Sequence, residues 1–335
     1  MALRFAGPFM SRRPRAAGAR WLAPVAAIAL IVSVSAGAAR AETLRVGKAV
    51  LEDFSFVPLD VGIRQGIFKK HGLEIESSAY AGGGRLQQAL TADSIDIGLG
   101  SSPEMASIVK GVPIKAVAAM VGPPALLALM VRPDGGIKTV DDLKGRRVGV
   151  TTANSLTAWV VRELSRQKGW GPDGISTMPL GAVPGLLAAL MMMQVDGFVA
   201  DISTLLHAEE VGEGKILVRF GDLVKDFHVH VIFATNKLIA SRPAAIREFL
   251  AGWFETIAFM RANREKSVET AMAVLSLDRN VAERTYDILM PTFSDDGRFN
   301  PKALAVLSRS YVELQFLPAE PDMSKLYTEE YLPKR

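Results

Sequence analysis

The sequence of 335 residues contains no cysteine. Without a thiol, the chain forms no disulfide, offers no thiolate to a metal, and has neither a cysteine nucleophile nor the attachment site of a lipoprotein anchor. Histidine is also scarce, with four residues in the whole chain. His228 and His230 share one face of an expected strand, but a third ligand at informative spacing is missing. We therefore predict a structural role for this pair and no bound metal or cofactor.

Acidic residues are absent from the first 41 residues. This segment places five arginines ahead of the apolar run from Trp21 to Ala39, and Ala39-Arg40-Ala41 then supplies the small residues of a cleavage site. That layout is typical of a secretory signal peptide, with an uncleaved membrane anchor as the alternative. We predict that residues 1–41 are a cleaved signal and that the mature protein works in a periplasm. The pair Arg12-Arg13 leaves general secretion and twin-arginine export both open.

The predicted mature chain has no large excess of basic or acidic residues. The full sequence has 39 basic and 35 acidic residues, but six of the arginines lie within residues 1–41. Cleavage would leave 33 basic residues against 35 acidic ones. The basic balance of the full chain therefore reflects the export signal, and the composition does not indicate a nucleic-acid partner.

From Thr43 onward, short apolar runs alternate with amphipathic stretches, and no period of 20 to 50 residues repeats. This alternation predicts an α/β fold with mostly parallel sheets. Strands are expected at residues 44–47, 73–80, 95–99, 114–120, 126–131, 147–150, 176–180, 198–200, 216–220 and 229–234. Helices are expected at residues 58–68, 85–92, 103–110, 156–168, 184–195, 204–212, 243–261, 266–275, 281–289 and 301–315.

A cluster of turn residues at 132–136 interrupts this alternation, which then restarts. The restart predicts two lobes. We expect residues 43–131 to form the first part of lobe 1, residues 132–232 to form lobe 2, and residues 233–335 to return to lobe 1 and add C-terminal helices. Two crossings between α/β lobes make a hinge and a cleft, and such clefts are common ligand sites.

Three strand-to-helix junctions, at residues 81–85, 100–103 and 151–155, are rich in Gly, Ser, Thr and Asn. In open α/β sheets, ligands lie beyond the carboxyl ends of the strands, where helix N-termini offer free amides. Ordinary helix capping is the alternative for each junction. Gln87 occupies the third glycine position of a dinucleotide fingerprint, and Gly100-Ser101-Ser102 lacks the spacing of a nucleophile elbow. The three junctions together favour a binding cleft without catalysis.

Two charged residues near the expected cleft indicate opposite ligands. Arg85 at a helix start is unfavourable unless a negative group lies opposite, and that group is a ligand anion, Asp96 or Glu104. Arg85 and the amide-rich junctions together favour an anionic or oxyanion-bearing ligand. Asp201 favours a ligand with a donor or a cationic group instead. The sequence leaves this conflict open.

Several segments, taken in order, resemble those of a known family. They are residues 44–47, 65–75, 83–84 with 88–90, 95–98 with 101–102, 111–115 and 141–150. With a signal peptide ahead of them, they resemble the periplasmic substrate-binding proteins of ABC importers for nitrate, sulfonates, taurine and thiamine-pyrimidine precursors. Many members carry Trp-Glu-Pro near positions 201–203, where this chain has Asp201-Ile202-Ser203. That departure leaves the ligand open.

The resemblance implies a type II periplasmic-binding fold whose two lobes close on a small molecule and deliver it to a membrane permease. The protein would then be a monomeric receptor, not an enzyme. Thiamine-precursor synthases on the same fold are an enzymatic alternative, but they resemble cytosolic proteins with a cysteine-rich motif. A ligand-sensing domain is a third possibility.

The candidate binding residues come from the matching junctions and from the expected mouth of the cleft. Phe54 and Phe56 are expected at this mouth, with packing on the lobe as the alternative. The full set is Phe54, Ser55, Phe56, Gly83, Gly84, Arg85, Ser101, Ser102, Thr152, Asn154, Ser155 and Asp201.

Overall fold

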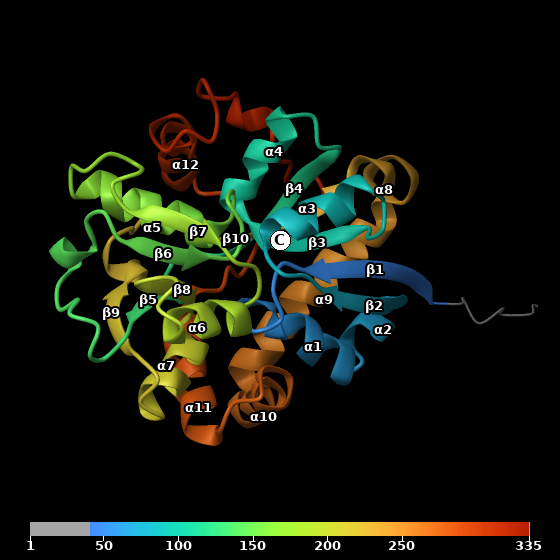
Figure 1. Cartoon of the computed structure of the whole chain (residues 1–335). Coiled ribbons are helices and arrows are strands. Elements are labelled where there is room, and N and C mark those ends of the chain that lie inside the picture. Colours follow the sequence, from blue (N-terminus) through green and yellow to red (C-terminus); the bar gives the residue numbers. More distant parts are fainter. Residues whose placement is uncertain (1–40, 335) are drawn as a thin grey trace, which may run out of the picture. The chain divides into compact units, whose positions relative to one another are not determined.

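The computed structural model describes residues 41–334, so the signal peptide expected at residues 1–41 lies outside the described residues except for Ala41. The described chain forms two five-stranded sheets with helices packed around them (Figure 1). Within residues 41–334, no helix combines the length and the apolar character that crossing a bilayer requires.

The first sheet has the strand order β2-β1-β3-β10-β4. β1 pairs in parallel with β2 and β3, whereas β10 runs antiparallel to both β3 and β4. Every residue of β3 and β10 is buried, as expected for apolar strands covered on both faces. The strand bounds are β1 Glu42–Lys48, β2 Leu73–Ala79, β3 Ile97–Ser101, β4 Ile114–Val121 and β10 His230–Thr235.

The second sheet repeats this plan with the order β7-β6-β8-β5-β9. β6 pairs in parallel with β7 and β8, and β5 runs antiparallel to β8 and β9. Each sheet therefore contains one central antiparallel strand that the chain supplies as it crosses between the lobes. The strand bounds are β5 Leu127–Val131, β6 Arg147–Val150, β7 Ser176–Pro179, β8 Gly197–Asp201 and β9 Lys215–Arg219.

The two crossings lie slightly earlier in the chain than expected. β5 belongs to the second sheet, so residues 127–131 are part of lobe 2 and not the end of lobe 1. β10 begins at His230, so the return to the first sheet precedes residue 233. The turn residues at 132–136 therefore come after the first crossing. They lie between β5 and β6, so they turn the chain within lobe 2.

The helices lie close to the expected ranges. One expected helix, at 58–68, is divided at Gly66, which adopts φ 69°, a left-handed conformation that favours glycine. The helix bounds are α1 Val57–Arg64, α2 Ile67–Lys70, α3 Gly83–Thr91, α4 Ala106–Val109, α5 Leu156–Gln167, α6 Val183–Met191, α7 Ile202–Glu210, α8 Asn236–Ser241, α9 Pro243–Ala262, α10 Arg264–Leu275, α11 Arg279–Leu289 and α12 Pro301–Glu313.

Helix α12 contacts both lobes, although the C-terminal helices were expected to return to lobe 1. The Ser310 hydroxyl accepts a hydrogen bond of 3.0 Å from the indole of Trp159 on α5, in the second lobe. The neighbouring Tyr311 hydroxyl donates to the carbonyl of Ser102, in the first lobe, at 2.9 Å. Trp159 also stacks on Phe227 with ring centroids 4.2 Å apart. α12 thus forms a buried connection between the two lobes.

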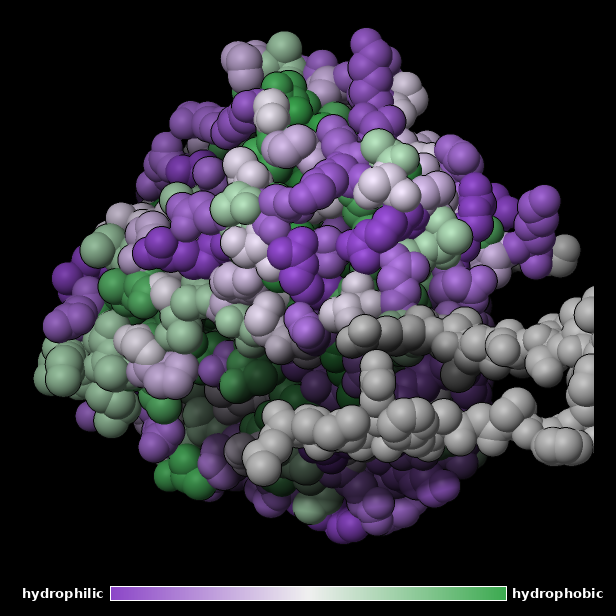
Figure 2. Space-filling view, turned by 90° about the vertical axis from the view of Figure 1, so that its right-hand side faces the viewer, coloured by the Kyte–Doolittle hydropathy of each residue, from purple (hydrophilic) through white to green (hydrophobic). Residues whose placement is uncertain are grey.

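On the face drawn in Figure 2, hydrophilic residues predominate in the upper part, and hydrophobic residues gather toward the left and lower left. Among the largest apolar side chains, Trp159, Trp253 and Phe249 are fully buried, whereas Met191, Met192 and Met193 at the end of α6 are exposed. Burial of the three aromatic side chains removes apolar surface from water, which is the main favourable contribution to folding.

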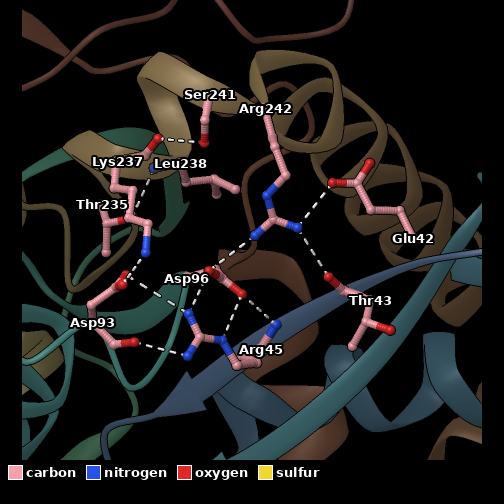
Figure 3. Close-up of polar contacts among 10 residues, drawn as sticks. All are labelled: Glu42, Thr43, Arg45, Asp93, Asp96, Thr235, Lys237, Leu238, Ser241 and Arg242. Atoms are coloured by element: carbon pink, nitrogen blue, oxygen red, sulfur yellow. Dashed lines mark hydrogen bonds and ion pairs between the residues drawn. The ribbon is translucent and has the colours of Figure 1, made fainter.

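An ionic network centred on Asp96 links β1, the start of β3 and the segment between α8 and α9 (Figure 3). Asp96 accepts from Arg45 through both oxygens, at 2.8 and 3.0 Å, and lies 3.0 Å from Arg242. Arg242 also pairs with Glu42 at 2.9 Å, and Lys237 pairs with Asp93. Asp96 precedes β3, so this network stands at the opposite end of that strand from the end that carries the serines. Because each of the three cations has a carboxylate partner, we assign the network a structural role.

Candidate ligand-binding site between the two sheets

A pocket lies between the two lobes and encloses about 50 Å³. That is space for roughly four water molecules. The first lobe contributes Ala49, Val50, Glu52, Asp53, Gly83, Ser101, Glu104 and His230. The second lobe contributes Leu127, Thr151, Ser155, Leu156, Thr157, Val183, Ala200 and Asp201.

The fold explains why polar residues gather here. Ser101 ends β3, Asp201 ends β8 and Thr151 directly follows β6. The carboxyl ends of parallel strands therefore meet at this pocket, as is usual for ligand sites in open α/β sheets. Helix α3 follows β2 and helix α5 follows β6, and the amino-terminal ends of both helices reach the pocket through Gly83 and Leu156.

Asp201 is the most unusual side chain of the pocket. It is only 5% exposed and caps helix α7, because its Oδ1 accepts from the backbone N–H of Ser203 at 2.9 Å and from the hydroxyl of the same residue. Its Oδ2 has no hydrogen-bond partner among residues 41–334. Burial and the neighbouring Asp53 carboxylate raise the pKa of Asp201 well above its usual range.

Asp53 faces this group from the first lobe. Its Oδ1 accepts from the backbone N–H of Ser55 at 2.7 Å, and its Oδ2 lies 3.5 Å from Nε2 of His230. Burial lowers the pKa of His230, although the Asp53 carboxylate acts in the opposite direction. His230 is therefore neutral at pH 7, and its Nδ1 has no partner in the described part of the chain. Two buried carboxyl groups thus meet across the pocket beside an uncharged imidazole.

Glu104 is a third buried acid on the first lobe. Its Oε1 accepts from the Ser101 hydroxyl at 2.6 Å, and its Oε2 accepts from the side-chain amide of Gln87 at 3.2 Å. Burial raises the pKa of Glu104 to about 7, against the hydrogen bonds from Ser101 and Gln87. Gly83 permits this arrangement, because a Cβ at that position would overlap Oε1 of Glu104.

Hydroxyl groups form the facing wall on the second lobe. Thr157 Oγ1 accepts from the backbone N–H of Thr151 at 3.0 Å and shares hydrogen bonds with the hydroxyls of Thr151 and Ser155, at 3.1 and 2.8 Å. Ser155 also caps α5 by accepting from the N–H of Ala158 at 3.3 Å. These hydroxyls are held in place by one another and by the helix start, so they form a preorganised polar surface.

The lobes touch beside the pocket. The backbone N–H of Gly84 donates to the hydroxyl of Thr152 at 3.2 Å, and a Cβ at Gly82 would collide with the Thr152 side chain. Two of the three junctions expected to hold a ligand therefore contact each other directly. Glycine is needed at position 82 for this close approach and also for its backbone angle, φ 111°.

Four of the twelve candidate residues line the pocket: Gly83, Ser101, Ser155 and Asp201. The other eight lie outside its lining. Gly84 and Thr152 form the interlobe contact, and Asn154 borders a separate surface hollow that Gly84 also lines. The hydroxyl of Ser102 donates to the backbone carbonyl of His228.

Phe54, Ser55 and Phe56 are buried in the first lobe and do not stand at the cleft mouth. Phe54 packs edge-on against Tyr286 and Phe293, with ring centroids 6.4 Å away from each. The expected position at the cleft mouth is therefore wrong, and the aromatic rings pack on the lobe. The segment still contributes to the site, because Asp53 directly before it lines the pocket wall.

Arg85 is exposed and also lies outside the pocket lining. Its Nη1 donates to Gln88 Oε1 at 3.1 Å, one helical turn along α3. Neither Asp96 nor Glu104 is its partner, because Asp96 pairs with the arginines of the network in Figure 3 whereas Glu104 is bonded to Ser101 and Gln87. Arg85 therefore does not support the expected anionic ligand.

Sequence reasoning missed Asp53, His230 and Thr157 as pocket residues and considered Glu104 only as a partner of Arg85. A signal existed for two of them. Asp53 adjoins the candidate segment at 54–56, and Glu104 follows the serine pair in the first turn of a helical segment.

The two neighbouring histidines were considered together as metal ligands, but they have separate surroundings. His228 Nε2 accepts from the backbone N–H of Asn300 at 2.7 Å, whereas His230 faces the pocket. No group of three His, Asp or Glu side chains within residues 41–334 is arranged to hold a metal ion.

The sequence of this chain is similar to those of known proteins. A family model described as NMT1/THI5 like matches residues 53–267. A protein of Brucella abortus (strain 2308), named as a binding protein, is 24% identical over 221 residues, which make up 65% of this chain and 67% of that protein.

Solved structures of binding proteins share the fold. The alkanesulfonate-binding protein SsuA from Xanthomonas axonopodis pv. citri, bound to MOPS, gives a TM-score of 0.74 at 17% identity, covering 85% of this chain and 98% of that one. The periplasmic nitrate-binding protein NrtA from Synechocystis PCC 6803 gives 0.70 at 15% identity, covering 86% of each chain. These similarities confirm the expected periplasmic-binding fold. With a family model matched over more than half of its length, the chain belongs to the NMT1/THI5-like family.

Proposed function

We propose that this protein is the solute-binding component of an ABC importer, which captures a small molecule between its lobes and presents it to a membrane permease. The observation that carries the proposal is the pocket lining, to which both lobes contribute polar side chains. A ligand held there contacts both lobes at once. It therefore stabilises the closed arrangement relative to an open one, which is how such a receptor reports that it is loaded.

The chemistry of the pocket supports binding rather than catalysis. Its two serines are engaged in local hydrogen bonds, Ser101 with Glu104 and Ser155 with the start of α5. The imidazole of His230 lies beside Asp53, and no described contact joins it to a serine hydroxyl. The chain also has no cysteine. The pocket thus supplies hydrogen-bond acceptors, hydroxyls and shape, without the paired nucleophile and base of a hydrolase.

The export signal expected at residues 1–41 and the periplasmic binding proteins among the similar structures support a periplasmic location. We propose that the chain is exported to the periplasm and acts there as a monomer with a permease partner. The intact mass of the exported protein tests the export step. A mass that matches a chain starting at Glu42 is expected, and a mass that includes residues 1–41 would contradict cleavage.

Ligand capture from a complex mixture tests the receptor function for any ligand that the mixture contains. The exported protein is incubated with a metabolite extract, freed of unbound compounds by rapid gel filtration and denatured, and the released compounds are identified by mass spectrometry. We expect one compound to be enriched in proportion to the protein and recovered unchanged. Loss of the compound with appearance of a product would support an enzyme instead, and failure to retain any compound would contradict a receptor.

A further inference from the structure

The lining of the interlobe pocket has charge of one sign. Glu52, Asp53, Glu104 and Asp201 all line it, and none of the described residues that line it is lysine or arginine. The only other titratable side chain in the lining, His230, is kept neutral by burial. An anion in this pocket would meet no cationic side chain, and every carboxylate of the lining that is ionised would repel it at short range in a poorly screened environment.

The acids alone do not define a site, but two buried atoms of the lining accept no N–H or O–H from residues 41–334. They are Oδ2 of Asp201, which adjoins the Asp53 carboxyl, and Nδ1 of His230, and the two residues are 5% and 4% exposed. Buried acceptors without a donor are unfavourable and are rare in folded proteins. Their position in the pocket lining, beside Asp53, indicates a ligand that supplies N–H donors and positive charge.

The remaining walls set the shape of such a ligand. Leu127, Leu156 and Val183 from the second lobe and Val50 from the first are apolar and line the same space. A ligand with a polar head and a short hydrocarbon part can therefore satisfy both kinds of wall. The small volume of the pocket in this arrangement limits the group that lies between the acids to a few non-hydrogen atoms.

We infer that the ligand is a small organic cation, whose ammonium or amidinium head lies between Asp53 and Asp201 and whose hydrocarbon part packs on Leu127, Leu156 and Val183. This inference rests on the proposed receptor function and adds the chemical class of the ligand. A third acid, at position 104, stands on the same wall as Asp53 and adds negative potential. A metal cation is a poorer occupant, because three side-chain ligands do not converge in the described chain.

Matched probes of opposite charge test the inference on the exported protein. The midpoint of thermal unfolding is measured with increasing propylammonium or acetamidinium, and in parallel with propane-1-sulfonate or nitrate. The Asp201→Asn variant is measured in the same way, because asparagine retains the helix cap while removing the charge. Asp134→Asn, at an exposed acid on the turn after β5, is the matched control.

We expect the cations to raise the unfolding midpoint of the wild-type protein and of Asp134→Asn, with affinity at least tenfold lower in Asp201→Asn. The anions are expected to leave all three midpoints unchanged beyond the effect of ionic strength seen with sodium chloride. Stabilisation by an anion, unchanged cation affinity in Asp201→Asn, or absence of any cation effect would overturn the inference. The capture experiment with a metabolite extract is independent of ligand charge, so a failure here and a failure of the receptor function are distinguishable.

Discussion

Asp53 on the first lobe and Asp201 on the second make matching local hydrogen bonds and face the same pocket. Each uses Oδ1 to cap the helical segment that follows it, accepting from the N–H of Ser55 and Ser203 respectively, and each lines the interlobe pocket. Capping fixes both side chains, so neither can turn away when the lobes meet. The packing of the two lobes therefore brings two carboxyl groups together, and a proton or a cation has to neutralise part of their charge.

Affinity for a cationic ligand should rise with pH. Burial and the neighbouring Asp53 raise the pKa of Asp201, so a cation bound beside these two carboxyl groups competes with a proton. Glu52, Glu104 and His230 also face this space, and the histidine is neutral. Titrations with propylammonium from pH 5 to pH 9 should show tighter binding at higher pH. Asp201→Asn should flatten this dependence, and an identical slope in both proteins would exclude Asp201 as the group responsible.

The same substitution should stabilise the empty protein. A carboxyl group whose folded pKa is raised contributes stability below its unfolded pKa, and this contribution is lost as pH rises through the folded pKa. Asp201→Asn removes that loss and keeps the cap. We expect its free energy of unfolding at pH 8 to exceed that of the wild type by about 1 kcal/mol, a typical size for relief of one close repulsive pair. Urea unfolding without ligand measures this, and a destabilised variant would contradict a repulsive contact.

Glu104 should make the wild-type protein less stable at alkaline pH. Its pKa is about 7 in the folded protein and 4.5 as the ordinary value. Its contribution is complete below pH 4.5 and is lost as pH rises through 7, with a full size of about 3 kcal/mol. Glu104→Gln retains an acceptor for Gln87 and cannot ionise. The stability of the variant relative to the wild type should therefore increase between pH 5 and pH 8, and a constant difference would show that Glu104 does not titrate there.

Protonation of His228 should make the wild-type protein less stable at acidic pH. Burial lowers its pKa to about 4 from 6.5, and its Nε2 accepts from the N–H of Asn300 inside the first lobe. The depressed pKa means that stability is present above pH 6.5 and is lost as pH falls through 4. His228→Gln offers an oxygen acceptor without a titrating ring. Urea unfolding at pH 5 and pH 7 should show a loss in the wild type that exceeds the loss in His228→Gln by about 2 kcal/mol. Equal losses in the two proteins would show that another group titrates in this range.

The Asp96 network should affect stability but not binding. Although burial favours its protonated form, hydrogen bonds from Arg45 and the nearby Arg242 lower the pKa of Asp96. Its contribution is therefore present at neutral pH and is lost as pH falls through the folded pKa. Asp96→Asn should cost about 2 kcal/mol at pH 7, as expected for hydrogen bonds to a charged group. Ligand affinity should remain within twofold of the wild type, and a larger change would mean that the network reaches the pocket.

The order of helices and strands, the division into two lobes and the family were all predictable from the sequence. The helices, strands and lobes depend on local patterns, such as apolar runs of strand length, helical periodicity and breakers at turns, which each segment carries with it. The periplasmic-binding fold was predicted correctly because an ordered set of segments resembles those of the substrate-binding family. The break at Gly66 was missed because a single glycine inside an apolar helical pattern does not by itself reveal its backbone angles.

The tertiary structure alone decided which strands belong to which sheet and which side chains share the pocket. β5 and β10 are similar apolar strands, and only their pairing shows that each crosses into the other lobe. Arg85 and Asp201 follow comparable strand-to-helix junctions, yet one is exposed and the other buried. Asp53 and Asp201 are separated by almost half of the chain, and no local sequence pattern indicates that they lie close together. Their pairing, and with it the sign of the charge in the pocket, results from the packing of the two lobes.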